Sequence, residues 1–140
     1  MSKLFILTKE MVEQPSIVCP ICGHYYAANG MGPQNNKKLT WAIQTVLFLT
    51  AKKFKFGSRA HDISYMVVSQ GQTLVYKHDK YQKVCQTRKC CDDLFYDLNL
   101  AAANNSYPWM KAYYRKWAKV TYDFVRQDGE SSFNHDQHYR

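Results

Sequence analysis

A histidine and an aspartate, His61 and Asp62, stand next to each other in an otherwise apolar segment, residues 59–68, that has the pattern of a helix. Packing alone gives such a helix little reason to hold an imidazole and a carboxylate side by side. We therefore expect a functional site, either a metal ligand beside a water-activating base or two ligands of one metal. For these two residues by themselves, the alternative is a hydrogen-bonded core histidine with a local aspartate partner.

Composition bounds the fold and the kind of partner. A chain of 140 residues that is 46% hydrophobic is long enough to bury one core. We expect a single globular domain over residues 1–127 and a mobile polar tail over residues 128–140. The 19 Lys and Arg residues outnumber the 11 Asp and Glu residues, which gives a net charge of +8. This excess favours an anionic partner, either nucleic acid or an anionic phospholipid surface.

Two apolar stretches bear on targeting. The run at residues 4–7 is too short for the core of a signal peptide, which needs about 7–15 residues. Residues 39–51 are interrupted by polar side chains and fall short of the roughly 20 residues that cross a bilayer. The sequence therefore predicts a cytoplasmic or intracellular protein without a transmembrane segment, and it leaves the oligomeric state open.

Five cysteines favour metal ligation, because an odd number without an export signal does not suit a disulfide framework. The first two form a C-x-x-C-G knuckle, whose tight turn aims two thiolates at one ion. We expect a structural zinc ion with four cysteine ligands, namely Cys19, Cys22, Cys85 and Cys90. Two further candidates for the fourth ligand are Cys91 and His24. The alternatives to zinc are buried free thiols or a disulfide.

Apolar periodicity and turn residues predict four helices and a hairpin. The helices cover residues 38–53, 59–68, 89–103 and 108–126, and the hairpin strands cover residues 73–76 and 81–84. Ser58 is the expected N-cap of the second helix. The expected fold class is mostly α: an antiparallel helix pair with a small β-hairpin and an N-terminal zinc knuckle.

The third predicted helix supplies a partner for the histidine. Asp92 lies on the more apolar side of that helix, three residues before Phe95. An antiparallel neighbour could carry this carboxylate to His61 and fix its tautomer, so that the other ring nitrogen can deprotonate water. Tyr65 lies four residues after His61 and faces the same way. Asp62 would hold a cation that polarises the carbonyl under attack.

These motifs resemble the phospholipase A2 superfamily. His61-Asp62-x-x-Tyr65 matches the catalytic helix of the family, and Cys91-Asp92 matches the opening of its antiparallel helix. The form with few disulfides, as in viral-capsid members, is the more similar one, and it leaves a viral origin open. The resemblance implies a hydrolase for phospholipid acyl esters, in which His61 is the general base and Tyr65 and Asp92 orient it.

The resemblance also implies a calcium site. Gly30 and Gly32 form a Gly-x-Gly sequence similar to the calcium loop of the family. Their backbone carbonyls would join the carboxylate of Asp62 in binding calcium.

Two other classes of function stay open. Metal-dependent phosphohydrolases of the HD kind also use adjacent His and Asp, but they need a further histidine on an earlier helix. A zinc-stabilised nucleic-acid- or protein-binding module without catalysis is favoured by the fourth helix. There Lys111, Arg115 and Lys119 form a basic stripe with aromatic neighbours, a pattern that can neutralise phosphates and stack bases. The alternative is that Trp117, Val120 and Phe124 are core residues and the basic residues are merely solvated.

Overall fold

The computed structural model describes residues 4–14, 17–18, 25–26 and 50–135. Several predicted features lie outside these ranges, namely Cys19, Cys22, His24, Gly30, Gly32 and most of the helix expected over residues 38–53. Within the described ranges the protein is mostly helical, as the sequence predicts. No helix in these ranges is long and apolar enough to cross a membrane.

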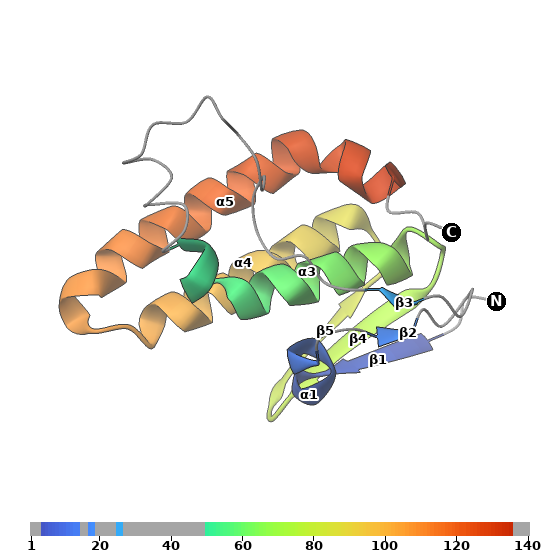
Figure 1. Ribbon diagram of the computed structural model, residues 1–140, viewed down its shortest axis with the longest axis horizontal. Coiled ribbons are helices and arrows are strands. Elements are labelled where there is room, and N and C mark those ends of the chain that lie inside the picture. Colours follow the sequence, from blue (N-terminus) through green and yellow to red (C-terminus); the bar gives the residue numbers. More distant parts are fainter. Residues whose placement is uncertain (1–3, 15–16, 19–24, 27–49, 136–140) are drawn as a thin grey trace.

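A three-stranded mixed sheet lies along one side of the molecule (Figure 1). The central strand β4 (Thr73–His78) pairs with β5 (Tyr81–Cys85) in antiparallel orientation and with β1 (Leu4–Thr8) in parallel orientation. The β4–β5 hairpin confirms the predicted one, whereas β1 is an addition. The short strands β2 (Ile17–Val18) and β3 (Tyr25–Tyr26) form a separate antiparallel pair.

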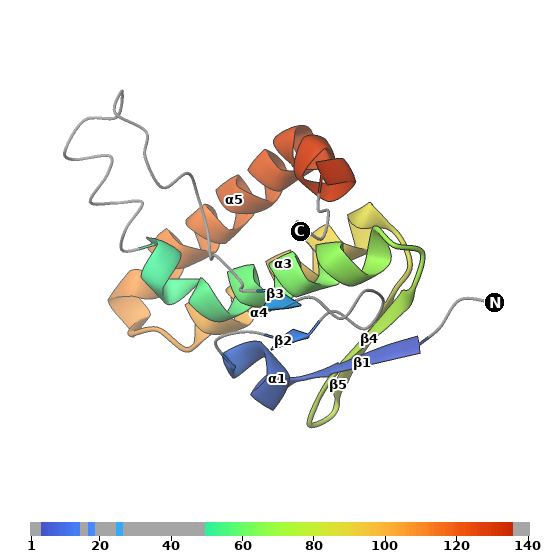
Figure 2. The ribbon, with the colours of Figure 1, turned by 45° about the vertical axis from the view of Figure 1, so that its right-hand side comes forward.

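The helices form two further layers, which both ribbon views separate from the sheet (Figures 1 and 2). The short helix α1 (Lys9–Glu13) follows β1 directly. Next to the sheet lie α3 (Lys55–Val68) and α4 (Arg88–Asn104), and α5 (Pro108–His135) packs against α4 on the side away from the sheet. The predicted second, third and fourth helices are thus present as α3, α4 and α5.

Two helix boundaries differ from the prediction. α3 begins at Lys55 with Phe54 at the N-cap position, so the prediction of Ser58 as N-cap was wrong. The amide of Ser58 already donates to the carbonyl of Phe54 at 2.9 Å, because a helical turn at residues 50–53 leads into α3. α5 continues through His135, so helix occupies much of the segment that we expected to be a mobile tail.

The hydrophobic core lies between the sheet and the α3–α4 layer. Its fully buried members include side chains from both layers, among them Leu7, Met66, Leu74 and Leu94. α3 and α4 are therefore packed against the sheet, and this packing positions the residues on the sides of the two helices that face each other.

Candidate functional site

α3 and α4 approach each other closely and run antiparallel. A Cβ atom added at Gly57 would collide with Oδ1 of Asn99, so the glycine permits the close approach at this end. About one helical turn further along α3, His61 faces Asp92 and Phe95 of α4. The partner numbers on α4 fall as the numbers on α3 rise, which is the antiparallel arrangement that the sequence predicts.

His61 and Asp92 form a buried hydrogen-bonded pair. Nε2 of His61 lies 2.7 Å from Oδ1 of Asp92, within the range of about 2.6–3.2 Å that joins a general base to its partner. The hydroxyl of Tyr65 donates to the same Oδ1 at 2.6 Å. Asp92 is 0% exposed and His61 is 7% exposed. The three residues that the sequence predicts to act together therefore do meet, and their catalytic role stays a prediction.

Two aromatic rings hold the imidazole in place. The ring centroid of His61 lies 4.1 Å from that of Tyr65 and 4.7 Å from that of Phe95. Among the described residues, no hydrogen bond reaches Nδ1 of His61, and 9% of its side-chain surface is exposed. Nδ1 is therefore the ring nitrogen left to accept a proton when Nε2 donates to Asp92.

Two arginines complete the surroundings of Asp92, and the sequence analysis missed both. Arg126 of α5 donates to Oδ2 of Asp92 at 2.6 Å, and Arg88 lies 3.6 Å from the same oxygen. Arg88 also donates to the carbonyls of Val125 and Arg126, at 3.0 Å and 3.3 Å. These bonds fix the start of α4 to α5. The i,i+4 spacing of Arg88 and Asp92 was a usable signal in the sequence, whereas nothing local points to Arg126.

Burial and hydrogen bonding set the protonation states of the site. Burial opposes ionisation of Asp92, but hydrogen bonds from His61, Tyr65 and Arg126 outweigh it and hold the pKa of this carboxyl below its usual value. Burial, followed by the hydrogen bond to Asp92, raises the pKa of the Tyr65 hydroxyl well above its usual value. At neutral pH, Asp92 is therefore a carboxylate and Tyr65 a neutral donor.

Asp62 is the described part of the predicted calcium site. It follows His61 on α3 and is partly buried. Its carboxylate is a hard oxygen donor of the kind that calcium prefers. Gly30 and Gly32 lie outside the described residues, and the described ranges contain no group of three or more His, Cys, Asp or Glu side chains placed to hold a metal. Calcium binding therefore stays a prediction.

Cys85 and Cys90, the described half of the predicted zinc site, meet as hydrogen-bonded thiols. Their Sγ atoms lie 2.9 Å apart, and the carbonyl of Val84, 3.0 Å from Sγ of Cys90, is a second acceptor for the single S–H hydrogen of Cys90. Two thiolates on one tetrahedral zinc, each at about 2.3 Å, lie roughly 3.8 Å apart, so these sulfurs would have to separate to bind it. Burial raises the pKa of Cys90 to about 12, which favours the neutral thiol. With Cys19 and Cys22 outside the described residues, zinc stays a prediction.

Comparisons of the chain with known protein families, with curated proteins and with solved structures find no match. The geometry around Asp92 and the motifs in the sequence are therefore the grounds for a functional inference.

Proposed function

We propose that this protein is a phospholipase A2-like hydrolase, in which His61 and Asp92 activate water to cleave the acyl ester of a phospholipid. The observation that carries the proposal is the 2.7 Å contact between Nε2 of His61 and Oδ1 of Asp92. This contact joins the histidine of one family-like motif to the aspartate of the other, across 31 positions of sequence. Sequence proximity therefore does not account for it.

In the proposed reaction, Asp92 accepts a hydrogen bond from Nε2 of His61, which leaves Nδ1 as the base. Nδ1 takes a proton from water as the water oxygen attacks the ester carbonyl. The carboxylate of Asp92 stabilises the imidazolium that forms. When the tetrahedral intermediate collapses, the imidazolium returns the proton to the departing alcohol oxygen, and a fatty acid and a lysophospholipid leave.

Tyr65 and Arg126 act on this reaction as positioning residues. Each donates to a different oxygen of Asp92, so that the carboxylate cannot rotate away from the imidazole. Together they also keep the buried carboxylate ionised, which it must be to stabilise the imidazolium.

Calcium fits the site through the chemistry of Asp62, whose carboxylate would hold the ion together with the carbonyls of Gly30 and Gly32. When bound, the ion would polarise the ester carbonyl and offset the charge that develops on its oxygen.

The competing proposal is a zinc-stabilised nucleic-acid- or protein-binding module without catalysis, in which the His61–Asp92 pair serves only the fold. A phosphohydrolase of the HD kind would need a further histidine, and the earlier candidate, His24, lies outside the described residues. A buried pair can stabilise a fold without taking part in a reaction. Detection of reaction products is therefore needed to distinguish the two proposals.

The test is an assay with phospholipid that carries different acyl chains at its two positions, in the presence of calcium, with mass spectrometry of the products. We expect release of the acyl chain from the sn-2 position. Added hydroxylamine should trap no acyl hydroxamate, because water attacks directly and no acyl-enzyme forms. His61→Gln should abolish release. Ser64→Ala is the matched control, since among the described residues the Ser64 hydroxyl donates its hydrogen bond to the backbone carbonyl of His61, at 2.7 Å, and reaches no side chain of the site. Absence of any acyl release by the wild-type protein would favour the binding module.

A further inference from the structure

The side chain of Asn99, on α4, is a fully buried carboxamide. Its exposed fraction is 0%, and among the described residues neither Nδ2 nor Oδ1 has a hydrogen-bond partner. Most buried polar side chains in proteins bond either to another protein group or to an ordered water. The amide of Asn99 is therefore a candidate contact for a small polar molecule.

Two more polar atoms without a partner lie beside this amide. The carboxamide of Asn99 lies against Gly57 of α3, and Ser58 is the next residue. Ser58 is 2% exposed, and within the described part of the chain its hydroxyl has no hydrogen-bond partner either. The other atom is Nδ1 of His61. Because His61 follows Ser58 by three residues, the two side chains lie within about 60° of each other around the helix.

The side chains of His61 and Asn99 lean toward each other. A helical side chain tilts toward the N-terminus of its own helix, and α3 and α4 are antiparallel. His61 therefore tilts toward Gly57, which Asn99 contacts, and Asn99 tilts toward Phe95, whose ring packs on His61. Nε2 of His61 points to Asp92, so Nδ1, on the other side of the ring, points away from Asp92 and toward Asn99.

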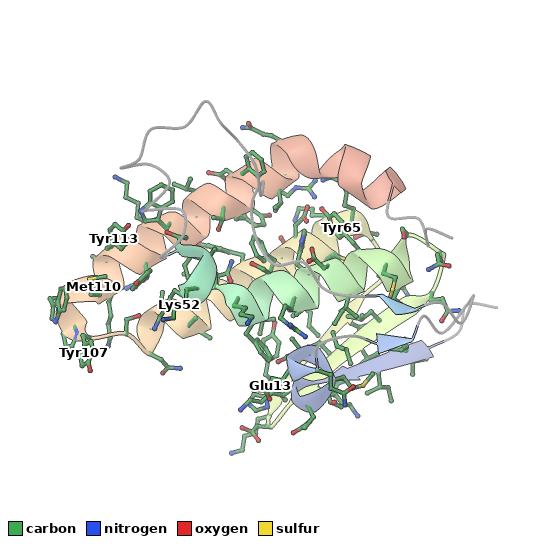
Figure 3. The ribbon with its side chains drawn as sticks, in the orientation of Figure 1. Glu13, Lys52, Tyr65, Tyr107, Met110 and Tyr113 are labelled. Carbon is green, nitrogen blue, oxygen red and sulfur yellow. The ribbon has the colours of Figure 1, made fainter. Side chains whose placement is uncertain are left out.

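These atoms lie along the middle of the α3–α4 pair. Figure 3 shows Tyr65 toward one end of the pair and Tyr107, in the turn that follows α4, toward the other end. Asn99 lies on the stretch of α4 between Asp92, which Tyr65 contacts, and this turn. We call Asn99, the Ser58 hydroxyl and Nδ1 of His61 the polar triplet.

α5 leaves the polar triplet without a partner. It packs against α4, and its Ala118 is fully buried. Trp117 is partly buried, whereas Val120 and Phe124 are 42% and 57% exposed. Val120 and Phe124 are therefore not core residues, which corrects the alternative that apolar periodicity suggested. The basic residues of the predicted stripe are exposed as well, namely Lys111, Arg115 and Lys119.

We propose that the polar triplet binds one water molecule, and that this water is the nucleophile of the proposed hydrolysis. Four residues separate Gly57 from His61, and four separate Phe95 from Asn99, a rise of about 6 Å along each helix. One water with a hydrogen bond of about 2.7–3.2 Å on each side bridges a gap of this size. Water is also small enough to be held among side chains that are almost fully buried.

The polar triplet offers this water three hydrogen bonds. Nε2 of His61 donates to Asp92, so Nδ1 is an acceptor and receives the first hydrogen of the water. The second hydrogen goes to the hydroxyl oxygen of Ser58, and the water oxygen accepts from Nδ2 of Asn99. One lone pair of the water oxygen is then left to attack the ester.

The proton and electron pair have defined destinations in the attack. As the lone pair forms the bond to the ester carbon, Nδ1 of His61 takes the first hydrogen as a proton. The second hydrogen stays on the oxygen, which becomes part of the released fatty acid. The ester would approach where the imidazole meets solvent, since 9% of the His61 side-chain surface is exposed.

The role of the water as nucleophile rests on the proposed hydrolysis, whereas the water site itself does not. Asn99 and Ser58 contact the water in this arrangement and do not contact the lipid. Their loss should therefore slow the chemical step and leave lipid binding unchanged.

The first experiment detects the water by NMR in the full chain, with isotope-labelled asparagine and without substrate. We expect a nuclear Overhauser contact between water and the Nδ2 protons of Asn99, with the sign of a long-lived hydration site. Asn104, exposed on the same helix, is the internal control and should show only rapidly exchanging solvent. Absence of the contact at Asn99 would overturn the water site, whatever the activity of the protein.

The second experiment measures kcat and KM on a short-chain phosphatidylcholine at concentrations where it is monomeric. Asn99→Leu replaces the amide by an apolar group of similar size, and Ser58→Ala removes the hydroxyl. We expect Asn99→Leu to lower kcat by about 10²-fold, the loss typical of a misplaced reactant, with KM within about twofold of wild type. Ser58→Ala should lower kcat in the same direction.

Matched controls make the same changes outside the polar triplet. Asn104→Leu alters an exposed asparagine of the same helix, and Ser64→Ala removes a buried hydroxyl that donates to the carbonyl of His61. Both should keep kcat and KM within about twofold of wild type. If Asn99→Leu raises KM and leaves kcat unchanged, Asn99 contacts the lipid, and its role as a water ligand is overturned.

Gly57→Ala tests the placement of Asn99. The added Cβ would displace the carboxamide while every member of the polar triplet stays in the chain. We expect a lower kcat when Asn99 is present and no further loss in Asn99→Ala, where no carboxamide remains to be displaced. Losses that multiply when the two changes are combined would overturn the placement.

The failure of this inference can be distinguished from the failure of the proposed function. If the wild type releases no acyl chain, hydrolysis fails and the nucleophilic role of the water fails with it, while the NMR contact alone decides the water site. If the wild type hydrolyses phospholipid and Asn99→Leu has the same kcat, the proposed function stands and the role of the polar triplet is overturned.

Discussion

The guanidinium of Arg126 lies 2.6 Å from Oδ2 of Asp92, across 34 positions of sequence. The Asp92 side chain is fully buried and the Arg126 side chain is 30% exposed, so the arginine closes the site from the α5 side. Through this contact a third helix fixes the carboxylate that His61 and Tyr65 share. The position of α5 is therefore tied to the geometry of the candidate base.

We predict that Arg126→Gln lowers the free energy of unfolding by about 1–2 kcal/mol, since a hydrogen bond to a buried charge is lost and the arginine is partly exposed. Arg88 lies 3.6 Å from the same oxygen of Asp92, so its charge should partly compensate for the loss of Arg126. Arg126→Lys should lose less, because it keeps the charge. Urea denaturation followed by circular dichroism measures the difference. Arg115→Gln, which removes an exposed charge from the same helix, should change stability by less than about 0.5 kcal/mol. Equal stability of the Arg115 and Arg126 variants would contradict the claim that the contact between Arg126 and Asp92 stabilises the fold.

The stability of the protein should depend on pH through Asp92. In the folded protein the pKa of Asp92 lies below its usual value of about 3.9, which the unfolded chain keeps. The ionised carboxylate therefore stabilises the fold above about pH 3.9, and this contribution is lost as the pH falls through the lower pKa of the folded protein. Asp92→Asn should therefore be destabilised at neutral pH, and its deficit against wild type should shrink below about pH 4.

Unfolding free energies of wild type and Asp92→Asn at several pH values test this. Asp79→Asn is the control, because Asp79 sits on the hairpin turn with a side chain 85% exposed. The control should unfold like the wild type throughout. A deficit of Asp92→Asn that stays constant down to the acid limit would show that the charge of the carboxylate does not stabilise the fold.

The thiols of Cys85 and Cys90 should alkylate slowly in the folded protein. Burial, followed by the hydrogen bond with Cys85, raises the pKa of Cys90 to about 12, and a hydrogen bond with Cys91, followed by burial, raises the pKa of Cys85. We expect iodoacetamide to modify both at least about 10-fold more slowly than in urea-unfolded protein, as peptide mass spectrometry would measure. A chelator should leave the rates unchanged. If it accelerates them, bound zinc protects the sulfurs, and the four-cysteine zinc site predicted from the sequence would be favoured.

The parts of the fold that the sequence predicts well are those with a local signal. Apolar periodicity marks α4, and Thr87 caps it through a bond from the amide of Cys90 to its side chain. The β4–β5 hairpin has β-branched and aromatic residues on both sides of a two-residue turn, where Asp79 takes a φ of 53°. The meeting of His61 with Asp92 is foreseeable because both motifs sit on long helices of clear type.

The parts that were missed depend on contacts between distant segments. β1 has too few residues to stand out, and it is a strand because it pairs in parallel with β4, from Leu4 with Thr73 onward. Serine is a common N-cap residue, but the amide of Ser58 already donates a hydrogen bond to the carbonyl of Phe54 in the preceding turn. Arg126 looks like an ordinary basic residue at the end of an amphipathic pattern, and only the packing of α5 on α4 gives it a buried partner.

The most direct test of the central claim is a double-mutant cycle on phospholipid hydrolysis, with wild type, His61→Gln, Asp92→Asn and the double variant. If the two residues act as one unit, each single change should lower the rate of acyl release, His61→Gln by about 10²-fold or more, and the double variant should be no slower than the worse single one. Losses that multiply in the double variant, or a His61→Gln protein as fast as the wild type, would contradict the claim that Asp92 orients His61 as the general base.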